Sequence, residues 1–235
     1  RGVRQKILED PLPDWRVQFN PARMVSTGAR IDKAAIESRP CFLCAKNRPE
    51  QQMTRIVDGR FELLVNPFPI LPQHFTIPAL EHQPQRIRPN YSTIHHLLVQ
   101  YPELLVFYNG PRCGASAPDH IHFQAGTSDQ LPLQQLWPRL SSNMTTLVSE
   151  DADNDLSLLR DYPVTAFVIR STSEEADSRL FGTLYDALPE DAESGEPMMN
   201  VLAWRSGESF VTVVIPRRKH RPDCYYDEGE GQMLV

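Results

Sequence analysis

The sequence predicts an α+β protein in which short strands outnumber helices, and three observations support this. Short apolar or alternating segments bounded by turn residues recur along the chain. The helical spacing of apolar residues is confined to a few short segments. There are 21 prolines in 235 residues, which favour turns and ordered loops over long helices. The candidate strands are residues 60–66, 73–77, 103–108, 119–125, 164–170, 200–204 and 209–215.

In the first half, these strands surround one helix. Residues 1–40 are polar, and we expect them to be irregular. The strand at 60–66 ends at Asn66-Pro-Phe-Pro69, because proline cannot donate a hydrogen bond to a sheet. Apolar side chains at positions 94, 97, 98 and 101 share one helical face, which predicts a helix over 91–101.

In the second half, we expect a short helix over 131–140 that Pro138 interrupts, followed by a polar connector over 141–157. A strand at 164–170 precedes a helix at 178–188 and an acidic loop at 189–197. Ser206-Gly207 separates two alternating segments, which predicts a hairpin.

A short internal similarity suggests two related units. Residues 77–84 and 215–222 share the pattern Ile-Pro-x-x-x-His-x-Pro, and each follows a candidate strand. We therefore expect a catalytic unit over 1–140 and a second, degenerate unit over 141–235 that helps to build the sheet. The chain begins at Arg1 and ends on an apolar tail, so we also expect it to be a fragment, trimmed at its C-terminus.

Composition excludes some classes of protein. The net charge of −6 argues against general nucleic-acid binding but allows a site for a small anion. No apolar run approaches the roughly 20 residues of a membrane span, and the start of the chain has no signal-peptide pattern. We therefore expect a cytoplasmic protein that uses neither nucleic acid nor membrane.

The run from Asn109 to Gln124 carries the strongest chemical signal. In an extended strand, His120, His122 and Gln124 point to one face. The preceding turn offers backbone N–H groups of Gly114 and Ala115 and the Ser116 hydroxyl to phosphoryl oxygens. His122 is the candidate nucleophile, because a neutral imidazole can attack phosphorus and form a covalent intermediate. The alternative is a pair of hydrogen-bonded structural histidines.

The four cysteines are Cys41, Cys44, Cys113 and Cys224. Without a secretory signal, a disulfide framework is disfavoured. Cys41-x-x-Cys44 has the spacing of half a zinc site, which His82 and His120 could complete as a structural centre. His74 competes as the third ligand. The alternative is a reduced cysteine pair packed in the core.

Other residues leave two interpretations open. Asn66 and Phe68 either end a strand or lie near the ribose or base of a nucleotide. Arg23 either meets a phosphate or is solvated. The basic run 217–221 is either a solvated surface or attracts an anionic co-substrate.

Taken together, these motifs resemble the transferase branch of the histidine-triad superfamily. Galactose-1-phosphate uridylyltransferase, diadenosine tetraphosphate phosphorylase and GDP-L-galactose phosphorylase belong to this branch. The resemblance covers about residues 18–126 and includes the Gly-Ala-Ser…His-x-His-x-Gln run, Cys41-x-x-Cys44 and Pro78-x-x-x-His82. The segment Ala117-Pro-Asp119 is one residue longer than its counterpart in the uridylyltransferase.

This resemblance implies an antiparallel half-barrel sheet with flanking helices, carried twice in one chain. It implies that His122 holds a nucleotidyl group, that His120 binds zinc and that Gln124 contacts the phosphoryl oxygens. Asn109 and Ser116 would line the phosphates.

The predicted function is therefore nucleotidyl transfer by an enzyme of the phosphorylase or uridylyltransferase type. The donor would be a nucleoside-diphosphate sugar or a dinucleoside polyphosphate, and inorganic phosphate or a sugar 1-phosphate would be the acceptor. A nucleotide hydrolase of the same superfamily and a non-catalytic nucleotide-binding protein are the alternatives. We expect a monomer or homodimer with structural Zn²⁺.

Overall fold

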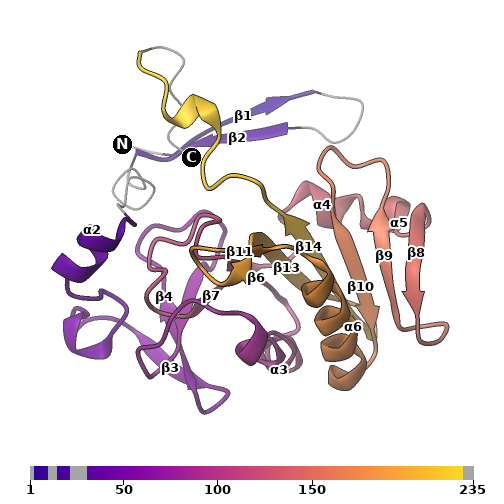
Figure 1. Cartoon of the computed structure of the whole chain (residues 1–235), viewed down its shortest axis with the longest axis horizontal. Helices are drawn as coiled ribbons and strands as arrows, with labels where there is room; N and C mark the ends of the chain where they lie inside the picture. The colour runs from indigo at the N-terminus through magenta and orange to yellow at the C-terminus, as the bar shows by residue number, and fades with distance from the viewer. Residues whose placement is uncertain (1–2, 10–14, 22–30, 230–235) are drawn as a thin grey trace.

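A computed structural model describes residues 3–9, 15–21 and 31–229. Ten strands form one antiparallel sheet in the order β3-β4-β5-β7-β6-β13-β14-β10-β9-β8 (Figure 1), which confirms the α+β class. Its strands are β3 (Thr54–Val57), β4 (Phe61–Val65), β5 (Phe75–Pro78), β6 (Leu104–Asn109), β7 (His122–Thr127), β8 (Met144–Ser149), β9 (Asp155–Leu159), β10 (Phe167–Ser171), β13 (Met199–Ser206) and β14 (Ser209–Pro216).

Short helices and two small strand pairs complete the described part of the chain. The pairs are β1 (Arg4–Leu8) with β2 (Trp15–Phe19), and β11 (Glu190–Asp191) with β12 (Glu196–Pro197). The helices are α2 (Lys33–Ser38), α3 (Ser92–Gln100), α4 (Pro132–Gln135), α5 (Trp137–Leu140) and α6 (Glu174–Ala187), with 3₁₀ turns η2 (Ala45–Asn47), η3 (Arg88–Asn90) and η4 (Asp223–Tyr225).

The two halves of the sheet have the same strand order. From one edge to the middle the order is β3-β4-β5-β7-β6, and from the other edge it is β8-β9-β10-β14-β13. In each half a helix, α3 or α6, follows the third strand. This order agrees with two related units, and their duplication stays a prediction. The Ile-Pro pattern does not mark it, because Ile77-Pro78 ends β5 and Ile215-Pro216 ends β14, and these strands hold different places in the order.

The sheet buries apolar side chains on both faces. On one face, side chains such as Phe123 and Ile77 pack with those of α3 and α6, which lie together over the sheet (Figure 1). On the other face, Phe107 and Trp204 pack in a second cluster with Trp137 of α5. Each fully buried side chain of this size contributes about 1.5–3 kcal/mol. Because strand residues alternate, Phe123 faces the α3 side and His122 and Gln124 face the other.

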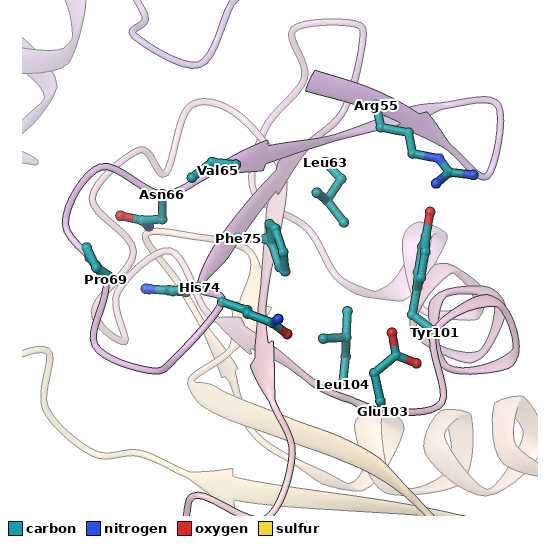
Figure 2. Close-up of a pocket in the computed structure, with 11 residues that line it drawn as sticks. Arg55, Leu63, Val65, Asn66, Pro69, His74, Phe75, Tyr101, Glu103 and Leu104 are labelled. Carbon is teal, nitrogen blue, oxygen red and sulfur yellow. The ribbon is translucent and has the colours of Figure 1, made fainter. Parts of the chain in front are cut away.

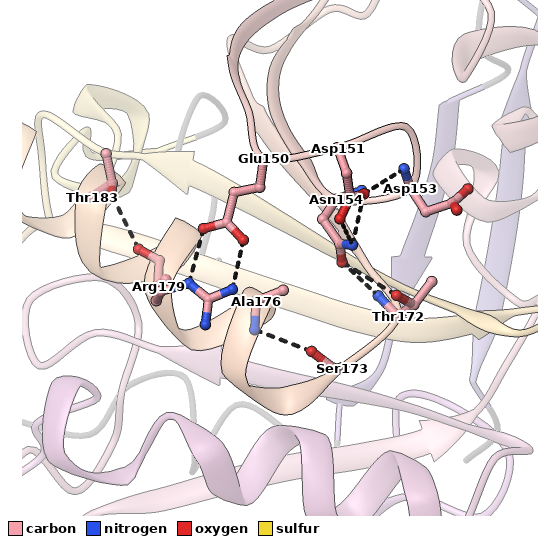
Figure 3. Close-up of polar contacts among 9 residues, drawn as sticks. All are labelled: Glu150, Asp151, Asp153, Asn154, Thr172, Ser173, Ala176, Arg179 and Thr183. Atoms are coloured by element: carbon pink, nitrogen blue, oxygen red, sulfur yellow. Dashed lines mark hydrogen bonds and ion pairs between the residues drawn. The ribbon is translucent and has the colours of Figure 1, made fainter.

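Residues 141–157 are a hairpin, not the predicted connector. Strands β8 and β9 pair along the sheet edge, where the side chains of β8 are largely exposed, so a polar sequence is compatible with the strand. Figure 3 shows how the polar residues of the turn are used. Asp151 accepts hydrogen bonds from the N–H groups of Asp153 (2.8 Å) and Asn154 (2.9 Å). Arg179 of α6 pairs with Glu150 at 2.7 and 3.0 Å.

Other boundaries also differ from the predictions. The segment 1–40 contains β1, β2 and α2, and β3 was not anticipated, because the side chains of these elements are mostly exposed. Pro138 lies at the start of α5, so the helix predicted over 131–140 is two short helices. Helix α6 begins at Glu174, because the Ser173 hydroxyl caps it by accepting from the N–H of Ala176 at 3.2 Å.

None of the helices in the described ranges combines the length and hydrophobicity that a bilayer crossing requires.

A buried carboxyl group should make stability depend on pH. Glu196 is 0% exposed and accepts hydrogen bonds from the Tyr108 hydroxyl (2.5 Å) and the Ile87 N–H (2.6 Å). Burial raises its pKa from 4.5 to about 7, so the folded protein binds this proton more tightly than the unfolded chain. The contribution is complete below about pH 4.5 and is lost as the pH rises through about 7.

The Glu196→Gln variant lacks this titration. Between pH 5 and 8, the free energy of unfolding of the wild type should fall by about 1–3 kcal/mol more than that of the variant. Urea unfolding of both proteins at the two pH values measures this. A difference between the proteins that stays constant with pH would contradict the assignment.

Candidate active site

His122 is the first residue of β7 and lies between β5 and β6. Its Nδ1 is 2.8 Å from the carbonyl oxygen of His120. A carbonyl can only accept a hydrogen bond, so Nδ1 carries the proton and Nε2 keeps its lone pair. Burial lowers the pKa of His122 to about 4, and the ring is therefore neutral at pH 7. These properties suit a nitrogen nucleophile.

Gln85 holds His122 beside Asn109, and sequence reasoning missed it. Gln85 is 1% exposed. Its Nε2 donates to the carbonyl oxygens of Asn109 (2.9 Å) and His122 (3.0 Å), and its Oε1 accepts from the N–H of His122 at 2.8 Å. The side chain thus joins the ends of β6 and β7. A single glutamine in a proline-rich loop has no sequence signal for this role.

The glycine-rich turn after β6 has two positions that require glycine. A Cβ at Gly110 would lie 2.8 Å from the Met199 carbonyl oxygen, and Gly114 has a φ of +99°. Within the described residues, the N–H groups of Gly114, Ala115 and Ser116 have no hydrogen-bond partner. Successive unpaired N–H groups make a turn attractive to an anion.

Gln124 faces the same side of the sheet as His122 and contacts His74. Its Oε1 lies 3.0 Å from Nε2 of His74, whose ring is 2% exposed. Nδ1 of His74 accepts from the N–H of Ile70 at 3.2 Å. The predicted row of three side chains is only partly correct, since β7 begins at His122 and the His120 ring lies against the cysteines instead.

Cys41, Cys44, His82 and His120 bring four potential metal ligands within 4.8 Å of one another. This is the predicted set, and His74 does not belong to it. Nδ1 of His120 lies 3.3 Å from Sγ of Cys41, and Nδ1 of His82 lies 3.3 Å from Sγ of Cys44. Ligands at about 2.0–2.3 Å from a tetrahedral ion are roughly 3.3–3.8 Å apart, so the set could hold Zn²⁺.

The surroundings of the cluster also fit a metal. Nε2 of His120 donates to the Ala79 carbonyl oxygen at 2.8 Å, which leaves Nδ1 free as a ligand. Asp119 lies 3.9 Å from Nε2 of His82 and pairs with Arg39 at 2.8 Å. All four ligand positions come from side chains, which is typical of a structural centre. Such a centre would join the loop before η2 to the start of β7.

Residues of the second half of the chain also contact the glycine-rich turn after β6. Arg217 donates to Oδ1 of Asn200 at 2.7 Å, and Nδ2 of Asn200 donates to Oδ1 of Asn109 and to the Cys113 carbonyl oxygen, each at 2.7 Å. In the same basic run, Lys219 pairs with Asp223 at 2.7 Å. The run is therefore neither wholly solvated nor wholly directed at the site.

Asn66 has a structural role in its own turn. Its Oδ1 accepts from the N–H of Phe68 at 2.8 Å, and its Nδ2 donates to the Thr76 hydroxyl at 2.9 Å. Phe68 is 36% exposed. The predicted phosphate ligand Arg23 lies outside the described residues.

A cavity of about 530 Å³ lies close by but is separate from this site. Its floor includes Leu63, Phe75 and Leu104, which face the α3 side of the sheet (Figure 2). Asn66 and His74 are at its border, while His122 and Gln124 do not line it. The cavity therefore lies on the face of the sheet opposite His122 and Gln124.

Solved structures share this fold. The yeast Ap4A phosphorylase in complex with AMP is 22% identical with a TM-score of 0.57, over 93% of this chain and 73% of that one. An ADP-glucose phosphorylase from Arabidopsis thaliana with bound ADP-glucose is 14% identical with a TM-score of 0.50, over 95% and 92%. A DUF4931 family protein from Bacillus cereus is 18% identical with a TM-score of 0.52, over 74% and 89%.

At identities this low, the TM-scores show that the chain shares the fold of these proteins. Among curated proteins, none matches the sequence. A family model described as "Domain of unknown function (DUF4922)" matches residues 1–127.

The cysteine–histidine cluster should contain about one equivalent of zinc. Cys44→Ser should lose the metal, because a hydroxyl is a poor replacement for a thiolate. At a metal concentration a thousandfold above Kd, the loss lowers stability by about 4 kcal/mol. Elemental analysis and thermal unfolding measure both effects. Cys224→Ser, outside the cluster, is the control, and equal metal content in the two variants would refute the site.

Proposed function

The chain belongs to the family described as "Domain of unknown function (DUF4922)", and we propose that it is a nucleotidyltransferase of the phosphorylase type. The observation that carries the proposal is the buried His122, with its proton held on Nδ1 by the His120 carbonyl oxygen at 2.8 Å. Its Nε2 is left as a nucleophile. A nucleoside-diphosphate sugar or a dinucleoside polyphosphate is the donor class.

In the first step, the Nε2 lone pair forms a bond to the α-phosphorus of the donor, and the bond from that phosphorus to the bridging oxygen breaks. The leaving sugar phosphate or nucleoside polyphosphate takes the bonding electrons. The His120 carbonyl stabilises the resulting imidazolium through the Nδ1–H bond. In the second step, an oxygen of inorganic phosphate or a sugar 1-phosphate attacks phosphorus, and the P–N bond breaks.

Gln124 supports a phosphate leaving group. An amide can donate a hydrogen bond but cannot transfer a proton near neutral pH. The leaving group must therefore depart as a stable anion, as a phosphate does, and the incoming phosphate needs no general base. The same reasoning disfavours water as acceptor, since water gains from a base. The hydrolase and the non-catalytic binding protein remain as alternatives for the test.

The N–H groups of the glycine-rich turn would bind the phosphoryl oxygens, with Ser116 and Asn109 beside them. Zn²⁺ would be held by Cys41, Cys44, His82 and His120 and would supply structural rigidity next to the nucleophile. Arg23, Asn66 and Phe68 remain proposed nucleotide contacts.

Incubation with a donor in the absence of acceptor should add one nucleoside monophosphate to the protein. Intact-mass spectrometry over a panel of nucleoside-diphosphate sugars and Ap4A detects the adduct, and the responsive donor identifies the base. His122→Asn should abolish it, because an amide nitrogen is not nucleophilic. His95→Asn, on α3 at the other face, should keep it. An adduct in His122→Asn at the wild-type rate would overturn the mechanism.

The rate of adduct formation should be insensitive to the protonation of His122 around neutrality. Burial lowers its pKa to about 4, so the nucleophile is neutral above that pH and becomes protonated only below it. In quenched-flow measurements between pH 5 and 8, the rate should show no decrease that follows the protonation of His122 with an apparent pKa near 6.5. Such a loss would mean that the ring is solvated and not held as described.

A further inference from the structure

Two side-chain amides flank His122. Gln124 follows two residues later in β7, and Asn109 ends β6, where Gln85 ties its carbonyl to that of His122. Each amide has a donating and an accepting end, which a half-turn of the group exchanges. Phosphoryl oxygens accept hydrogen bonds only, so the orientation of each amide decides whether it attracts or repels the substrate.

A chain of hydrogen bonds sets the orientation of Gln124. The N–H of Ile70 donates to Nδ1 of His74 at 3.2 Å, so the proton of the neutral ring is on Nε2. Nε2 therefore donates to Oε1 of Gln124 at 3.0 Å. The His74 ring is 2% exposed and is stacked 5.8 Å from the ring of Phe107, which holds it in place.

A second series of hydrogen bonds sets the orientation of Asn109. Arginine has only donors, so Arg217 must donate to Oδ1 of Asn200, at 2.7 Å. The Nδ2 group of Asn200 must then donate, and it has two acceptors at 2.7 Å, Oδ1 of Asn109 and the Cys113 carbonyl oxygen. The backbone carbonyl independently requires the same orientation.

Both series of hydrogen bonds end at the oxygen of a side-chain amide. Oε1 of Gln124 and Oδ1 of Asn109 are each occupied by a donor. Within residues 3–9, 15–21 and 31–229, Nε2 of Gln124 and Nδ2 of Asn109 have no hydrogen-bond partner. Both residues are half-buried, so their N–H groups remain available to a ligand.

We propose that His74 and Asn200 are positioning residues that fix Gln124 and Asn109 with their N–H₂ groups toward the phosphoryl group at His122. This inference rests on the proposed function, and it deepens it by giving each half of the chain a part in the site. His74 lies in the first half, whereas Asn200 and Arg217 lie in the second. The preset donors need no reorganisation when negative charge develops.

Substitutions that reverse hydrogen-bond polarity at nearly constant size test this. An ionised glutamate in His74→Glu only accepts, so Gln124 must turn its N–H₂ toward it and present oxygen to the phosphate. His74→Gln can still donate and is the matched control. Asn200→Asp introduces a carboxylate that only accepts, so Asn109 must turn its N–H₂ group toward it and present oxygen to the phosphate. Each polarity reversal should slow formation of the His122 adduct by at least about tenfold and weaken binding of nucleoside monophosphates, while His74→Gln stays near the wild type.

The pH profile separates orientation from damage to the fold. Once protonated, the carboxyl group introduced by His74→Glu donates again, so the rate gap between His74→Glu and His74→Gln should narrow from pH 8 to pH 6, since burial favours the neutral carboxyl. Among the described residues, the titratable or charged groups that line the cavity with His74 are Arg55, Tyr101 and Glu103, and both variants retain them. The carboxylate introduced by Asn200→Asp would lie beside Arg217, which favours its ionised form. The rate of adduct formation in this variant should therefore not recover as the pH falls from 8 to 6.

The outcomes are distinguishable. Thermal unfolding and metal content first establish that each variant is folded. If His74→Glu fails to fold, the results for Asn200→Asp alone decide whether the inference holds. Titration with AMP, GMP, UMP and CMP is the second readout. An adduct in the wild type with equal rates and affinities in all variants overturns the inference and leaves the proposed function intact. No adduct in the wild type, with weaker nucleotide binding in the reversals, overturns the proposed function and retains the inference. If the wild type binds none of the four nucleoside monophosphates, both the proposed function and this inference are overturned.

Discussion

The hydrogen bond from Nδ1 of His122 to the carbonyl oxygen of His120, at 2.8 Å, is the constraint on which the site depends. It assigns the proton to one ring nitrogen and leaves the other for chemistry, while burial keeps the ring neutral. The carbonyl itself is fixed because the His120 ring contacts Ala79 on one side and the cysteine pair on the other. The cysteine–histidine cluster and the proposed nucleophile are therefore adjacent parts of one segment.

The sheet places the remaining groups around that segment. Antiparallel pairing of β7 with β5 and β6 brings Thr76 and Phe107 opposite Gln124, and the central pairing of β6 with β13 brings Asn109 opposite Asn200. The second half of the chain thus meets the first at the strand end where the glycine-rich turn begins. In the proposed site, residues of the second half would contribute in this way by orienting donors without touching the reacting atoms.

Sequence reasoning was most successful where a pattern is local. The helix over 91–101 and the strands near 60–66, 73–77 and 103–108 were correctly predicted, because the helix shows a helical apolar period and the strands are short apolar runs bounded by turn residues. It was wrong for 141–157, because an exposed edge strand has no apolar period. The likeness at Ile77 and Ile215 falls on strands with different places in the sheet order, while the strand order itself agrees with two units, whose duplication stays a prediction.

By itself, the sequence determined which chemically reactive groups the protein offers: the His-x-His-x-Gln run, the cysteine pair and the glycine-rich turn are short patterns that depend only on neighbours in the chain. Only the tertiary structure decided how they are held. It placed His82, and not His74, with the potential metal ligands, set His74 against Gln124 and set Gln85 against His122. The physical reason is separation along the chain: Asn200 reaches Asn109 across 91 residues, and such contacts arise from strand pairing, which no local pattern encodes.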